Sequence, residues 1–177
     1  MESVLPGLRA MPNIHPVLVH FPIAFLWGAL LVELLAVWRR RDDWHRVAVV
    51  LLYLGAAGAV AAATSGWFAE ETVEHTEASH EVLELHQAIM LWMTSITVVL
   101  AGIAFFGTGR LETRRLQVFL LVGLLVVCLM LLVGADRGGQ LVYQFGTGVE
   151  KPVPPPPPAA ETAPAAPQSQ QQHQHQH

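Results

Sequence analysis

Charged residues are scarce in this sequence. Only 14% of its 177 residues are Asp, Glu, Lys or Arg, whereas 53% are hydrophobic. An ordinary soluble domain carries roughly a quarter charged residues. The shortage of charge therefore excludes an ordinary soluble globular domain and indicates a membrane protein.

Cysteine and two sequence motifs are also scarce or missing. Cys128 is the single cysteine, so an intrachain disulfide is excluded and a packing role is expected. The motif C-x-x-C-H does not occur, which excludes haem attachment through that motif. The motif H-E-x-x-H does not occur either, so the sequence does not support a zinc metalloprotease.

Long apolar runs, in contrast, are present four times. Each run approaches the roughly 20 residues that an α-helix needs to cross a bilayer. The runs are apolar on every face, which argues against four amphipathic helices of a soluble bundle. We therefore expect an all-α fold, a bundle of four transmembrane helices within residues 1–149. The runs are Pro16–Trp38, Val47–Phe68, Ala88–Phe106 and Leu116–Ala135.

The loops between these runs differ in charge. The second loop, Ala69–Leu85, contains six glutamates and no Lys or Arg, whereas the first and third loops are rich in arginine. Because basic loops stay in the cytoplasm, the first and third loops are predicted to be cytoplasmic and both termini to lie outside. The expected location is a bacterial inner membrane, with periplasmic termini. The arginines are Arg39, Arg40, Arg41, Arg46, Arg110, Arg114 and Arg115.

Residues 150–177 have a different composition from the rest of the chain. They contain Pro154–Pro158 and then alanine, proline and glutamine, and they end in alternating Gln and His from His173 to His177. Such a segment cannot bury a core, so a disordered tail with a stiff polyproline spacer is expected.

Histidines stand at the start of two of the apolar runs. His15 and His20 open the first run, and His86 opens the third. The first and third helices run in the same direction, so these imidazoles are expected at similar depth near the outer surface. Asp136 follows the fourth helix on the same side. Ionisable groups at membrane depth are costly to bury and are therefore candidates for function.

Two imidazoles on facing helices suit a haem iron, which takes axial ligands from both sides. The sequence thus suggests haem b with His20 and His86 as axial ligands, and with His15 and Asp136 beside them. Met90 is then expected to line a haem edge. Gly66 belongs to a small-residue face of the second helix that also favours close helix packing.

Two other interpretations of the same histidines remain open. The residues His15, His20, His86 and Asp136 supply enough nitrogen and oxygen ligands for Zn or Cu. Alternatively, the histidines are structural and bond to backbone groups, since buried polar groups need partners. The chain is then a non-redox accessory or structural membrane subunit.

Two residues inside the first run break its apolar pattern. Pro22 lacks an N–H and leaves the carbonyl of Leu18 without its helical partner, which loosens the helix beside His20. Glu33 is the only acid inside an apolar run. It is expected to snorkel towards the loop arginines, and proton transfer is the functional alternative.

The acidic loop, Glu70–Glu84, carries glutamates at spacings of three and four residues. On a helix this spacing makes one continuous acidic stripe, usually a solvated face. A docking surface for a basic partner such as a soluble c-type cytochrome is the functional alternative, because surface fields steer association. Homo-oligomers, a haem between two copies and a larger complex also remain open.

The opening H-P-x-L-V-H-F-P-I, from His15 to Ile23, resembles that of a family of small bacterial membrane proteins, domain of unknown function family 2231. Thr64-Ser65-Gly66, the histidine that opens helix three, and Gly138–Gly146 resemble the same pattern. The resemblance covers residues 12–149.

This family is similar in outline to four-helix b-type cytochromes, and relatives occur joined to c-type cytochrome domains. The resemblance therefore implies electron transfer at the outer membrane face, with quinol as a possible donor, and carries over His15, His20 and His86. This chain has Phe145 where a histidine is expected, which argues against a ligand from that segment.

Overall fold

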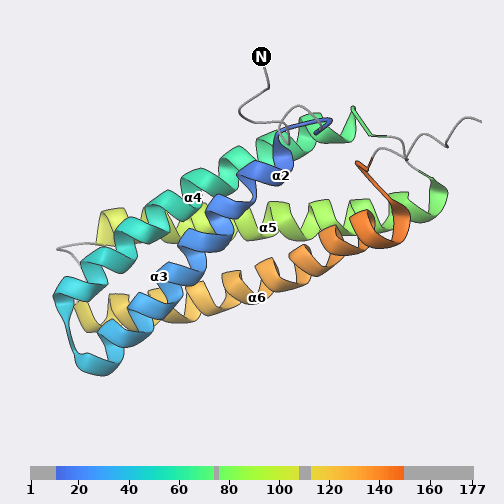
Figure 1. Ribbon diagram of the computed structural model, residues 1–177. Coiled ribbons are helices and arrows are strands. Elements are labelled where there is room, and N and C mark those ends of the chain that lie inside the picture. The colour runs from blue at the N-terminus through green and yellow to red at the C-terminus, as the bar shows by residue number, and fades with distance from the viewer. Residues whose placement is uncertain (1–10, 74–75, 108–112, 150–177) are drawn as a thin grey trace, which may run out of the picture.

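The computed structural model describes residues 11–73, 76–107 and 113–149, and this part of the chain is all-α (Figure 1). The predicted tail, 150–177, lies outside the described residues. The all-α prediction is confirmed. The helices are α2 (His15–Leu18), α3 (His20–Arg39), α4 (Asp42–Glu70), α5 (Glu77–Gly107) and α6 (Thr113–Phe145).

Four helical segments are long and apolar enough to cross a membrane, so the expected number of spans is confirmed. They are His15–Arg39, Asp42–Glu70, Glu77–Gly107 and Arg114–Phe145. The third begins well before the apolar run at Ala88, because the helix continues through the polar residues from Glu77 onwards. At about 1.5 Å per residue, each of these helices is long enough for a hydrocarbon core of roughly 30 Å.

The helices pack as an up-and-down bundle (Figure 1). α3 packs on α4, α4 on α5, α5 on α6, and α6 back on α3, while the short α2 packs on α4 and α3. In this closed ring α3 and α5 are parallel and lie diagonally across the bundle. We call the end that holds His15, Glu70 and His86 the histidine end, and the end that holds Arg40 and Thr113 the arginine end.

The first membrane segment is interrupted between α2 and α3. Pro22 has no N–H to donate to the carbonyl of Leu18, and the regular helix breaks at Val19. The chain nevertheless continues in helical conformation, since Val19 has φ −63° and ψ −22°. The interruption lies directly before His20, and the predicted loosening there stays a prediction.

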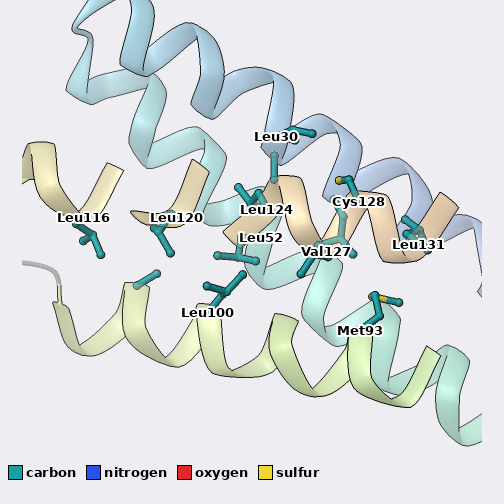
Figure 2. Packing of buried hydrophobic residues seen from close by; sticks show 13 residues of the cluster. Leu30, Leu52, Met93, Leu100, Leu116, Leu120, Leu124, Val127, Cys128 and Leu131 are labelled. Carbon is teal, nitrogen blue, oxygen red and sulfur yellow. The ribbon is translucent and has the colours of Figure 1, made fainter. Parts of the chain in front are cut away.

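A contiguous apolar core fills the bundle from its middle towards the arginine end (Figure 2). Cys128 is fully buried within this core, as expected for a packing role. On α5 the core ends at Met93, about two helical turns from His86. The histidine end therefore lies beyond the main core. The labelled core side chains are Leu30, Leu52, Met93, Leu100, Leu116, Leu120, Leu124, Val127, Cys128 and Leu131.

Glycines allow the two helices of each hairpin to approach closely. A Cβ on Gly55 of α4 would lie 2.6 Å from Cδ2 of Leu26, and a Cβ on Gly123 of α6 would lie 2.6 Å from Cδ2 of Leu100. Such contacts are too short for any side chain larger than glycine's without movement of the leucine. Close packing at small residues is the usual means by which membrane helices associate.

Candidate functional site at the histidine end

His15 is the first residue of α2, and its ring is bonded to α4. Its backbone N–H donates to Oδ1 of Asn13 over 3.2 Å, which satisfies one donor at the start of the helix. Its Nδ1 lies 3.0 Å from the carbonyl oxygen of Ala62 and 3.0 Å from Oγ of Ser65. The Ser65 hydroxyl donates to the same carbonyl over 2.9 Å. The imidazole is thereby fixed against one turn of α4.

These contacts determine which nitrogen of neutral His15 carries the proton. The carbonyl of Ala62 can only accept, so Nδ1 must donate to it. Nε2 is then left with its lone pair, which is the form of imidazole that binds a metal. A backbone carbonyl on Nδ1 is a common way of orienting a metal-binding histidine.

Gly66 provides the space in which the His15 ring lies. A Cβ at Gly66 would be 3.1 Å from Cε1 of His15 and 3.4 Å from its Nδ1. Both distances are shorter than most contacts that a real Cβ makes, so a side chain at Gly66 would press on the ring. The predicted role of Gly66 in leaving room for a planar cofactor stays a prediction, and its direct neighbour in the structure is the His15 imidazole.

His86 of α5 is held by α6 in the same manner. Its Nδ1 lies 2.8 Å from the carbonyl oxygen of Gly134, and a Cβ on Gly138 would lie 3.2 Å from its Cε1. The acceptor is again a carbonyl, so Nδ1 carries the proton and Nε2 has the lone pair. Sequence reasoning selected His86 but missed Gly138 as the residue that accommodates its ring.

The His15 and His86 contacts occur at equivalent positions in two similar hairpins. In each hairpin the accepting carbonyl lies four residues before the glycine that faces the ring. The histidine and this carbonyl are 47 residues apart for His15 and 48 for His86. The two hairpins thus hold their histidines by the same kind of contact.

His15 and His86 belong to the same end of the bundle and are close enough for an electrostatic interaction with each other. Both side chains are half-buried. Neither Nε2 has a hydrogen-bond partner among the residues that the structure describes. This end of the bundle therefore holds two imidazoles that are fixed through Nδ1. Each has a lone pair on Nε2 that no described residue uses.

The other predicted site residues take different positions. His20 is exposed, and Asp136 is exposed on a surface of α6 shared with Gln140 and Tyr143. Met90 is half-buried, and its sulfur packs against Gly134, in the seam between α5 and α6. The axial role of His20 and the roles of Asp136 and Met90 stay predictions. The contacts favour His15 over His20 as the counterpart of His86.

A metal site of three or more protein ligands is not assembled in the described part of the chain. No group of at least three His, Cys, Asp or Glu side chains comes together there. Structural zinc sites almost always have four ligands and catalytic ones three. The described residues therefore do not bring His15, His20, His86 and Asp136 together as one metal-binding group.

The acidic loop is divided between two helices. Glu70 ends α4 and accepts a hydrogen bond from Nε2 of Gln87 over 2.9 Å, whereas Glu77, Glu81 and Glu84 belong to α5 and are exposed. Residues 74–75 lie outside the described residues, so Glu74 is not placed. The glutamates thus do not form one continuous stripe on a single helix, because α4 ends before α5 begins.

A second pair of polar residues is buried at the arginine end. Glu33 is 1% exposed, and both of its carboxylate oxygens contact Nδ1 of His45, at 2.9 and 2.8 Å. The expectation that Glu33 snorkels towards the loop arginines is wrong, because His45 offers a partner inside the bundle. Sequence reasoning missed His45. The sequence does contain a signal for this pair. Glu33 and His45 lie at similar distances before and after the short turn at Arg40, on antiparallel helices.

The comparisons with known proteins identify a family of membrane proteins. Comparison with curated proteins and with solved structures finds no match for this chain. The family described as "Predicted membrane protein (DUF2231)" matches residues 11–151, which include all the described helices. The chain therefore belongs to the predicted membrane protein family DUF2231.

Proposed function

We propose that this chain is a b-type haem protein that transfers electrons at the histidine end of the bundle, where His15 and His86 would hold the haem iron. One observation carries the proposal. Both imidazoles are fixed through Nδ1 to backbone carbonyls, at 3.0 and 2.8 Å, so that each Nε2 keeps a lone pair. Hydrogen bonds of this kind orient a ligating imidazole and raise its basicity.

The residues that face the two rings are small, so each imidazole lies close to the neighbouring helix. The helices next to them present Ala62, Gly66, Gly134 and Gly138, which have little or no side chain. The main apolar core ends before this level of the bundle. Haem, when bound, supplies one-electron chemistry at its iron. The protein's own contribution is to hold two imidazoles, one from α2 and one from α5, in fixed orientation.

Electron exchange with other molecules is proposed at the same end. Glu77, Glu81 and Glu84 are exposed there and offer a negative surface to a basic acceptor such as a soluble c-type cytochrome. Quinol within the bilayer is the proposed donor. The arginine distribution predicts that this end faces the periplasm.

Reduced-minus-oxidised absorbance spectra of the purified full-length protein test the proposal. We expect the sharp α band of a b-type haem in the wild type, and loss of this band in His15→Ala and in His86→Ala. His20→Ala is the matched control and should keep the band, since His20 is exposed. A wild-type protein that stays spectrally silent after reconstitution with haem contradicts the proposal.

A structural role for the histidines is the second candidate. The bonds from His15 to Ala62 and from His86 to Gly134 each tie together the two helices of one hairpin. In that case the protein binds no haem, and each alanine substitution lowers the thermal stability of a colourless protein. Spectra and unfolding curves of the same samples separate the two candidates.

A further inference from the structure

The buried pair Glu33–His45 is separate from the candidate haem site. Glu33 precedes the arginine end of α3 by about two turns, and it lies 18 residues along the chain from His15, which corresponds to roughly 27 Å of helix. The side chains of Glu33 and His45 are 1% and 8% exposed. An isolated carboxylate at this depth is costly, so the pair is stable only when His45 or a proton compensates its charge.

The charged residues at the arginine end lie on three helices and in the turn between α3 and α4. They are Arg39 on α3, Arg40 and Arg41 in the turn, Asp42, Asp43 and Arg46 on α4, and Arg114 and Arg115 on α6. Asp42 accepts from Nε2 of Gln117 over 3.0 Å, Arg114 donates to the carbonyl of Val37 over 2.8 Å, and Arg41 pairs with Asp43. Residues 88–107 of α5 contain no charged residue. His45 is thus the direct partner of Glu33 among the described residues.

We propose that Glu33 and His45 form a proton-binding site that exchanges protons with water at the arginine end. In the deprotonated site Glu33 is a carboxylate that accepts from Nδ1–H of neutral His45. A proton from water binds Nε2 of His45, and Nδ1 passes its own proton to a carboxylate oxygen of Glu33. The products are a neutral carboxylic acid and a neutral imidazole with its proton on Nε2, so the site binds one proton in all.

The difference in exposure supports this direction of transfer. His45 lies in the first turn of α4 and retains some contact with the surface, whereas Glu33 is almost completely enclosed. An imidazole can take a proton on one nitrogen and release another from the second, which suits it to this relay. The proposal does not rest on haem binding.

Infrared spectroscopy of the full-length protein in lipid nanodiscs tests the proposal. We expect a carboxylic acid C=O band that grows on acidification and that is lost in Glu33→Gln. Asp43→Asn, which removes an exposed acid at the same end, should keep the band. In His45→Gln, which retains a donor to Glu33 but cannot relay a proton, we expect exchange of this band in D2O to slow by roughly 100-fold.

Two results would overturn the proposal. One is a Glu33 carboxyl that keeps a single protonation state over the whole pH range in which the protein stays folded. The other is wild-type exchange in His45→Gln. If Glu33→Gln does not fold, ¹⁵N NMR of the wild type can instead show which ring nitrogen of His45 carries a proton at each pH. A change of tautomer from Nδ1–H to Nε2–H on acidification supports the relay, and a constant tautomer contradicts it.

Discussion

The imidazole of His86 donates its Nδ1–H to the backbone carbonyl of Gly134 across the α5–α6 seam, over 2.8 Å. His15 makes the corresponding bond to Ala62 in the other hairpin, over 3.0 Å. In both cases the acceptor is a backbone group, which no side-chain substitution removes. The orientation of each ring therefore depends on the shape of the facing helix, and above all on the glycine beside it.

Alanine at Gly66 or Gly138 should displace the facing imidazole. The new Cβ would lie 3.1 Å from Cε1 of His15 or 3.2 Å from Cε1 of His86, so the ring must move by a few tenths of an ångström. We expect each substitution to lower the free energy of unfolding by about 1–3 kcal/mol. If haem is bound, its spectrum should change as well. Denaturant titration and absorbance spectra of the same samples measure both effects.

Gly102→Ala is the matched control for these substitutions. A Cβ on Gly102 of α5 meets no atom within 4 Å. Alanine is the better helix former by up to about 1 kcal/mol, so this variant should be at least as stable as the wild type. Equal destabilisation by all three substitutions would show that glycine matters for the helices in general rather than for the histidine rings.

The fold was predictable from the sequence because it depends on few, strong signals. Four runs of about 20 apolar residues leave little choice beyond a helical membrane bundle. The break beside Val19 followed from the missing N–H of Pro22. The ends of α5 were less predictable, since the first turns of that helix are polar and carry no hydrophobic pattern.

The details of the candidate site were harder to predict, for physical reasons. The bonds that fix His15 and His86 go to backbone carbonyls, and hydropathy says nothing about which carbonyl a ring will meet. Depth alone cannot separate His15 from His20, because the two differ in the face of the helix on which they lie. The Glu33–His45 pair depends on the geometry of the turn between α3 and α4, which sequence periodicity does not reveal.

Breaking the Glu33–His45 pair should be strongly destabilising, whereas replacing both partners should cost much less. Glu33→Leu or His45→Leu alone leaves a buried polar group without its partner, and we expect each to cost roughly 3–5 kcal/mol. The double variant replaces the pair by apolar side chains, so its loss should be well below the sum of the two single losses. A double-mutant cycle of unfolding free energies in mixed micelles measures this difference. Additive losses would show that the two side chains do not interact.

Arg40 is a position at which glycine should stabilise the protein. Arg40 ends α3 in a left-handed conformation, φ 54° and ψ 49°, and the N–H of Arg41 bonds to the carbonyl of Ala36 over 3.0 Å. A non-glycine residue in this conformation is unfavourable by roughly 1 kcal/mol. We expect Arg40→Gly to be more stable than Arg40→Ala by about this amount. The two variants lose the same charge, so equal stability would contradict the expected backbone effect.

Cysteine labelling can measure the orientation of the protein in the membrane, because its own cysteine should not react. Cys128 is fully buried, so a membrane-impermeant maleimide should not label the wild type in intact cells. Glu84 and Asp43 are exposed at opposite ends of the bundle, Glu84 near the histidine end and Asp43 near the arginine end. Because arginine-rich loops stay in the cytoplasm, Glu84→Cys should be labelled from the periplasm and Asp43→Cys only after lysis. The reverse pattern would place the histidine end in the cytoplasm, and with it the proposed haem site and its redox partner.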